Sequence, residues 1–199
     1  MAAELELKTI VPDSADLRAR LLAAGARLAF RGLMEDRRYD RDGALLGRDE
    51  VLRVRRFIDA DGVSEAELTW KGRTARSEGG YKLREELTCR IAAGSASPGR
   101  ILEALGYVVG QAIDRQVEVY ELAGAVLRIE WYPRMDVLLE VEGPPPAIEA
   151  AIRTTGLPRD GFTAEILADF VLRYDARGGR RAALALADLE GERPAWETR

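Results

Sequence analysis

The sequence predicts an α+β domain built on a largely antiparallel sheet or barrel. About eight short segments alternate polar and apolar residues with the period of two that is typical of half-buried strands. These segments follow one another at hairpin-like spacing, and a few segments with helical periodicity lie between them. At 199 residues, the chain has the length of one domain that can bury a substantial core.

The first elements are a strand and a helix. The strand is ELELKTIV, residues 4–11, and the helix occupies residues 12–26, where Asp13 or Ser14 caps its start and Gly25 ends it. The helix carries an apolar stripe formed by Leu17, Leu21 and Leu22. Strand-like runs then follow in residues 36–41, 50–58, 65–72 and 80–91.

The second part of the chain continues the same alternation. A short helix, residues 98–105, is stopped by Gly106. Three further strands are expected in residues 116–124, 125–133 and 137–143. Two helices are expected in residues 145–156, opened by prolines, and in residues 163–174. The residues after Gly178 are expected to form one more helix before a frayed end.

Composition excludes several classes of function. The chain has no histidine, so Ser-His-Asp triads, HExxH zinc sites and imidazole acid–base chemistry are impossible. Its single cysteine, Cys89, allows no internal disulfide and no multi-cysteine zinc site, and we expect it to pack on the outer side of its strand. No long apolar run or signal peptide is visible, and the net charge is -4. We therefore expect a cytoplasmic protein without membrane or nucleic-acid partners.

Charged side chains recur at alternate positions of the predicted strands, each time opposite an apolar face. A single strand of this kind is explained by a solvated outer face. The repetition in the same phase over so many strands instead favours charged faces that line the interior of a closed barrel. The positions are Arg53 and Arg55; Glu67 and Lys71; Lys82, Arg84 and Glu86; Arg128 and Glu130; and Glu140 and Glu142.

A charged barrel interior needs a ligand and counter-ions, because buried like charges repel. Paired arginines and lysines match phosphate, since Arg offers planar bidentate donors and Lys a mobile point charge. Clustered carboxylates suit Mg²⁺ or Mn²⁺, which prefer oxygen ligands. An interior that offers both kinds of group would hold a metal-bound, highly anionic phosphate chain.

The chain resembles the CYTH group, the triphosphate tunnel metalloenzymes. ELELK matches the ExExK signature of that group, and the later signatures appear in order between about residues 3 and 143. They are DRRYD, with Asp36, Tyr39 and Asp40, then LRVR, LTWKG, KLREE and RIE…LLEVEG. The group contains class IV adenylyl cyclases, thiamine triphosphatases and inorganic triphosphatases.

The resemblance implies a closed tunnel of eight antiparallel strands with helices outside and a triphosphate-containing small molecule inside. The tunnel domain would span residues 1–175, followed by a helical or frayed tail in residues 176–199. By motif position, the ligands of Mg²⁺ or Mn²⁺ would be Glu4, Glu6, Glu130, Glu140 and Glu142. The phosphate-binding residues would be Lys8, Arg53, Arg55, Lys71, Lys82, Arg84 and Arg115. The catalytic residues would be Glu4, Glu6, Lys8 and Glu86.

Two positions depart from the pattern of the group. A K-x-R pair often precedes the VY strand; here IDRQVEVY supplies Arg115, but Val117 replaces the second base. One phosphate contact of the group is thereby in doubt. The acid at position 130 is commonly Asp or Asn, and the longer Glu130 is either a metal ligand or a structural partner of Arg128.

The function expected from these features is divalent-metal-dependent hydrolysis of an inorganic or organic triphosphate, such as thiamine triphosphate, with Glu86 or a metal-ligand glutamate orienting the water. One alternative is a class IV adenylyl cyclase that converts ATP to cyclic AMP and pyrophosphate, although the sequence identifies no site for adenine. A second alternative is a non-catalytic polyphosphate- or nucleotide-binding module. The protein is expected to be a monomer or a homodimer.

Overall fold

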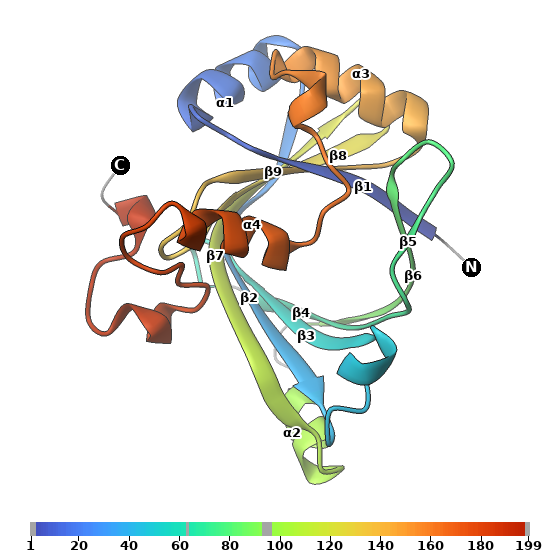
Figure 1. Ribbon diagram of the computed structural model, residues 1–199, viewed down its shortest axis with the longest axis vertical. Coiled ribbons are helices and arrows are strands. Elements are labelled where there is room, and N and C mark those ends of the chain that lie inside the picture. Colours follow the sequence, from blue (N-terminus) through green and yellow to red (C-terminus); the bar gives the residue numbers. More distant parts are fainter. Residues whose placement is uncertain (1–2, 63, 93–96, 198–199) are drawn as a thin grey trace.

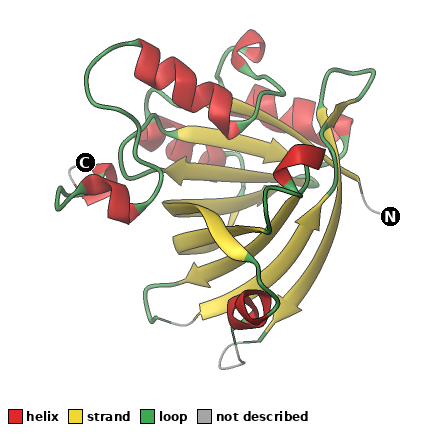
Figure 2. Ribbon diagram, turned by 60° about the horizontal axis from the view of Figure 1, so that its bottom comes forward, coloured by secondary structure: helices red, strands yellow, loops and turns green. Residues whose placement is uncertain are grey.

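The computed structural model describes residues 3–62, 64–92 and 97–197 of the chain. It confirms the predicted fold class: a closed antiparallel barrel with helices packed on its outside. Figure 2 shows the strands as one curved sheet with the helices around it. Within the described ranges, no helix is both long and apolar enough to cross a membrane.

In the described residues, nine strands form one sheet in the order β1-β9-β8-β7-β2-β3-β4-β6-β5. An additional antiparallel pairing of β1 with β6 joins the ends, so that eight of these strands close into a barrel. The strands are β1 (Ala3–Ile10), β2 (Arg27–Asp40), β3 (Val51–Ile58), β4 (Ser64–Lys71), β5 (Ala75–Arg76), β6 (Lys82–Ile91), β7 (Val108–Leu122), β8 (Ala125–Trp131) and β9 (Leu138–Glu142).

The helices lie outside this barrel (Figure 1). They are α1 (Ser14–Ala23), α2 (Pro98–Ala104), α3 (Pro145–Thr155) and α4 (Leu167–Ala176). Short 3₁₀ helices are η1 (Leu46–Arg48), η2 (Arg159–Gly161), η3 (Leu186–Leu189) and η4 (Ala195–Glu197). The start of α1 is capped by Asp13, whose Oδ1 accepts the backbone N–H groups of Ala15 and Asp16 at 2.9 and 3.0 Å.

The main hydrophobic core lies between the outer face of the barrel and the helices α1 and α3. Leu17 and Leu21 of α1 are buried there, as predicted, whereas Leu22 is 52% exposed. The strands contribute the residues that alternate with the charged positions, such as Leu7 of β1 and Leu127 of β8. This packing turns the apolar face of each strand outward and leaves the charged face for the interior.

Helix α4 covers one end of the barrel. Its Phe170 packs in a second cluster with Ile113, Tyr132 and Leu138. Leu138 is the register partner of Glu130 across β8 and β9, so both side chains share one face of the sheet. Figure 1 shows α4 in front of the barrel opening.

The structure also differs from the predicted boundaries. Strands β2 and β7 pair over almost their whole lengths and are much longer than residues 36–41 and 116–124, and α4 begins at Leu167 rather than at residue 163. Beyond α4, the expected single helix is replaced by η3 and η4, and Ala183 bridges to Arg134. Cys89 is exposed rather than packed.

Candidate functional site

The charged side of β1 faces the barrel interior. Glu6 and Lys8 are both buried, and Lys82 contacts Glu6 from β6. On the other face, Leu7 is buried in the core beneath α1 and α3, and Leu5 packs against the same core. The inward direction of the ELELK charges therefore follows from the burial of its leucines.

One side of the interior is lined by carboxylates from β1, β8 and β9, which we call the acidic wall: Glu6, Glu130, Glu140 and Glu142. Lys8 lies among them, with its Nζ 2.7 Å from Glu6 Oε1 and in contact with Glu140. Burial acts to lower the pKa of Lys8, but the attraction of Glu140, Glu6 and Glu130 outweighs it, so the pKa lies above its usual value. Lys8 is therefore positively charged at neutral pH.

Arg128 is a second cation among the carboxylates of the acidic wall. Its Nη1 contacts Glu140 and lies 3.7 Å from Glu130 Oε1, and its Nη2 lies 3.2 Å from Glu142 Oε2. Burial acts to raise the pKa of Glu140, while the charges of Lys8 and Arg128 lower it more strongly, to well below its usual range. The chain thus supplies its own cations to a cluster of buried acids.

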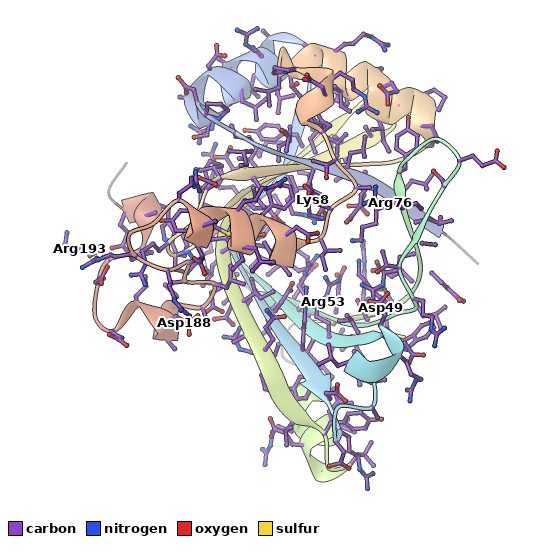
Figure 3. The ribbon with its side chains drawn as sticks, viewed as in Figure 1. Lys8, Asp49, Arg53, Arg76, Asp188 and Arg193 are labelled. Carbon is purple, nitrogen blue, oxygen red and sulfur yellow. The ribbon has the colours of Figure 1, made fainter. Side chains whose placement is uncertain are left out.

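The facing side of the interior is lined by cations from β3, β4 and β7, which we call the basic wall: Arg53, Arg55, Lys71 and Arg115. Asp36 of β2 lies at its centre and is 1% exposed. Figure 3 shows Lys8 and Arg53 on opposite sides of the barrel opening, from the acidic and the basic wall respectively.

Three arginines share the carboxylate of Asp36. Arg55 binds it with two hydrogen bonds, Nε to Oδ1 at 2.7 Å and Nη2 to Oδ2 at 3.0 Å. Arg115 Nη2 donates to Oδ2 at 3.0 Å, and Arg53 Nη1 lies 3.7 Å away. Burial acts to raise the pKa of Asp36, but Arg55, Arg115 and Arg53 lower it well below its usual range.

Arg53 is the least compensated member of the basic wall. Its side chain is 8% exposed and its Nη2 lies 4.0 Å from Glu86 Oε1, while its buried Nε has no hydrogen-bond partner among the described residues. Burial and the repulsion of Arg55 lower the pKa of Arg53 to about 10. Glu86 instead pairs closely with Lys71, with Oε2 2.6 Å from Nζ, and accepts the Thr88 hydroxyl at 2.8 Å.

Arg84, a predicted phosphate-binding residue, is buried and bonded to backbone carbonyls. Its Nε donates to the carbonyl of Gly72, and its Nη2 donates to the carbonyl of Asp49 at 2.6 Å. Asp49 has a left-handed backbone with φ of 56°, and its carboxylate accepts the backbone N–H of Thr74 at 2.7 Å. Arg84 thereby joins β6 to the segments that precede β3 and follow β4.

Glu130, which departs from the pattern of the CYTH group, has two partners in the structure. Glu130 Oε1 lies 3.1 Å from Arg115 Nε, and its Oε2 accepts the hydroxyl of Tyr132 at 2.6 Å. Burial and the charge of Glu130 raise the pKa of Tyr132 well above its usual value, so that the hydroxyl stays protonated. Val117, the second departure, is fully buried opposite Glu130 in the register of β7 and β8.

Among the described residues, no three acidic side chains are gathered as a ready metal site. Glu4 is paired with Arg84 in the register of β1 and β6, but its side chain lies outside what the structure describes. The four acids of the acidic wall offer only oxygen donors, which fits Mg²⁺ or Mn²⁺ in kind. Positive charge from Lys8 and Arg128 already lies among these oxygens.

Sequence reasoning missed Arg38. Its side chain is on the same face of β2 as Asp36, directly opposite Arg53 in the register of β2 and β3. Its Nη1 donates to Gln111 Oε1 at 2.8 Å, while no described residue accepts a hydrogen bond from its buried Nε. Burial lowers the pKa of Arg38 despite the attraction of Asp36. The period of two counted from Asp36 was the signal that marks Arg38 as inward.

No protein-family model matches the sequence, and it is similar to no curated protein. Solved structures do resemble the fold. A candidate adenylate cyclase from Vibrio parahaemolyticus aligns with a TM-score of 0.70 and 14% identity, over 85% of this chain and 97% of that one. The PH1819 protein from Pyrococcus horikoshii aligns with a TM-score of 0.66 and 21% identity, over 85% and 98%.

A third similar structure is HpAC1 from Hippeastrum, a candidate adenylyl cyclase described as having a dominant triphosphatase activity. It aligns with a TM-score of 0.58 and 17% identity, over 90% of this chain and 98% of that one. At these identities the likeness is one of fold. In the part of the chain that the structure describes, this protein has the closed eight-stranded antiparallel barrel fold that its resemblance to the CYTH group implies.

Proposed function

We propose that this protein is a divalent-metal-dependent triphosphatase that binds an inorganic or organic triphosphate inside its barrel. The observation that carries the proposal is that the acidic wall and the basic wall face each other across the barrel interior. On the basic wall, Arg53, Arg55 and Arg115 share the carboxylate of Asp36. Arg115 also pairs with Glu130, so the excess positive charge lies mainly at the buried Arg53, whose carboxylate contacts are no closer than 3.7 Å. A polyanion would supply the missing negative charge.

The basic wall positions the substrate. Arginine presents a planar fork of N–H donors that matches phosphate oxygens, and Arg53 and Arg55 lie two residues apart on the same face of β3. Asp36 fixes Arg55 through both of its oxygens, so that this guanidinium is oriented before the substrate arrives. Lysines 8, 71 and 82 add mobile charges, and each of them is paired with a glutamate.

In hydrolysis, a water oxygen attacks the terminal phosphorus and the bridging P–O bond breaks. Tripolyphosphate then yields orthophosphate and pyrophosphate, and the proton of the water is released. The basic wall stabilises the charge that develops on the leaving oxygen, in an interior that excludes most bulk water. Glu86 lies beside Lys71 and Thr88, where it would orient either Lys71 or the attacking water.

The residues that would hold Mg²⁺ or Mn²⁺ are Glu6, Glu130, Glu140 and Glu142, together with Glu4. When bound, the ion would neutralise phosphate charge and lower the pKa of a coordinated water. Lys8 and Arg128 now contact these same acids, so their positive charges would have to turn toward the phosphate chain. Their side chains are long enough to change partners without a movement of the backbone.

The test is to incubate the protein with tripolyphosphate, thiamine triphosphate and ATP, each with Mg²⁺ or Mn²⁺, and to identify the products. Orthophosphate and pyrophosphate from tripolyphosphate, or orthophosphate and thiamine diphosphate from thiamine triphosphate, are the expected results. Cyclic AMP with pyrophosphate from ATP would replace the proposal with an adenylyl cyclase. Tight binding of all three compounds without turnover would replace it with a binding module.

A further inference from the structure

We propose that Arg38 is an additional anion-binding residue of the barrel interior, and that Arg38 and Arg53 bind the same phosphate group from neighbouring strands. This inference rests on the proposed function, because it takes the anion in the barrel to be a polyphosphate. Neither the motifs of the sequence nor the CYTH resemblance gives Arg38 a role.

The first observation is the pairing of two arginines. Arg38 of β2 and Arg53 of β3 are direct partners in the antiparallel register, so their side chains leave the same face of the sheet as nearest neighbours. Like charges placed directly opposite one another across two strands destabilise the sheet. The buried guanidinium of Arg53 and the half-buried one of Arg38 need an anion between or above them.

The second observation is that both arginines have an unused donor. The Nε atoms of Arg38 and Arg53 are buried and have no hydrogen-bond partner in the described part of the chain. A buried N–H without an acceptor costs free energy, and the cost is larger for a charged group. Two such donors on adjacent side chains indicate that the acceptor is a ligand rather than a part of the chain.

The third observation is that the nearby carboxylates are already engaged. Asp36 accepts two hydrogen bonds from Arg55 and one from Arg115, and Glu86 pairs with Lys71 at 2.6 Å. The one side-chain partner of Arg38 among the described hydrogen bonds is the neutral amide of Gln111. Gln111 orients Arg38 but leaves its charge uncompensated.

The ligand chemistry follows from these groups. Two guanidinium forks on adjacent strands offer several N–H donors to one tetrahedral anion, and a phosphate group has oxygens enough to accept them. Arg38 of β2 lies one strand from Arg53, and Gln111 of β7 lies one strand further, so Arg38 adds a guanidinium between the parts of the basic wall on β3 and β7. Arg38 and Arg53 would therefore bind one phosphate group of the polyphosphate together.

The experiment measures binding of tripolyphosphate to the protein by calorimetry, in the presence of a chelator so that no turnover occurs. Arg38→Gln is expected to weaken binding by roughly tenfold to a hundredfold, the equivalent of one or two charge-assisted hydrogen bonds. Arg38→Lys, which keeps the charge but loses the fork, is expected to fall between the wild type and Arg38→Gln.

Arg37→Gln is the matched control. Arg37 is the adjacent residue on the outer face of β2, where its Nη1 pairs with Asp114 Oδ1 at 2.7 Å, so this variant removes the same charge from the same strand. It is expected to bind tripolyphosphate as the wild type does. Melting temperatures without ligand show whether each variant is folded, and Arg38→Gln is expected to melt no lower than the wild type because its arginine is uncompensated.

The outcomes separate the two proposals. If the wild type binds tripolyphosphate and both Arg38→Gln and Arg37→Gln bind it equally well, the role of Arg38 is overturned while the proposed function stands. If the wild type itself does not bind tripolyphosphate without metal, the role of Arg38 is overturned, and the turnover assay with Mg²⁺ or Mn²⁺ decides the proposed function separately. A wild type that binds, with a loss confined to the Arg38 variants, supports the inference even if no turnover is later found with a metal.

Discussion

Asp36 on β2 and Arg55 on β3 form a two-pronged ion pair inside the barrel, with Oδ1–Nε and Oδ2–Nη2 distances of 2.7 and 3.0 Å. Both side chains are almost fully buried, and Arg115 donates to the same carboxylate from the other side. This pair fixes the centre of the basic wall. Because it is buried and shared, its removal leaves several charges without a partner.

Asp36→Asn is therefore expected to lower the free energy of unfolding by about 3–5 kcal/mol, the range found when one partner of a buried ion pair is removed. The measurement is urea denaturation at neutral pH. The control is Glu35→Gln, the neighbouring acid on the outer face, whose exposed pair with Arg56 at 2.9 Å should be worth about 1 kcal/mol or less. Equal losses in the two variants would contradict the central place of Asp36.

The contribution of Asp36 is expected to depend on pH. Its pKa in the folded state is held well below the usual value by Arg55, Arg115 and Arg53 against the opposing effect of burial. A depressed pKa stabilises the fold above the unfolded-state pKa of about 4, and this stabilisation is lost as the pH falls through the folded-state value. The difference in unfolding free energy between the wild type and Asp36→Asn should therefore shrink from about pH 5 downward. A difference that stays constant with pH would contradict the lowered pKa of Asp36.

Glu142→Gln is expected to abolish most metal-dependent turnover while sparing the fold. Glu142 belongs to the acidic wall, but its side chain is 23% exposed, compared with 8% for Glu140. Removing its charge should therefore cost less folding stability than removing that of Glu140. Loss of one metal ligand should reduce kcat by about a hundredfold or more, equivalent to about 2.7 kcal/mol of transition-state stabilisation. Glu121→Gln, an exposed acid paired with Arg27 on the outside, serves as control and should retain full activity.

Removal of metal is expected to stop turnover without unfolding the protein. The four carboxylates of the acidic wall already contact four cations, Lys8, Lys82, Arg115 and Arg128, so the fold does not depend on an added cation. A chelator should change the melting temperature by less than about 2 °C, which corresponds to less than about 1 kcal/mol for a chain of this size. A large drop in melting temperature would show that the metal is structural.

Much of the architecture was predictable because the relevant signals are local. The period of two identified the strands, and the leucines of ELELK and the motifs that follow it indicated which face turns inward. The ends of β2 and β7 were not predictable, since their outer parts pair with each other and need no strong pattern of their own. The chain after α4 packs through Ala183 and Leu189, residues that also suit a helix, and tertiary contacts decided the outcome.

The partners of the interior side chains were harder to predict than the positions of the charged residues. The motifs named Arg84, but only the structure shows that its guanidinium is bonded to the carbonyls of Gly72 and Asp49. DRRYD contains two adjacent arginines, and the period of two places Arg38 inside and Arg37 outside, but only the register shows that Arg38 lies opposite Arg53. Partners distant in sequence determine these details, and the sequence alone does not state them.

The closure of the barrel by β1 also determines when the site can form during folding. Strand β1 pairs with β6 and with β9, which ends at Glu142. Glu6 and Lys8 can therefore meet the acids of β9 only after most of the barrel sequence has been synthesised. Contacts so distant along the chain carry a high loop-closure cost and slow folding. During synthesis, the first strand emerges with its charged and apolar faces both unpartnered, and the two walls meet only when this last seam closes.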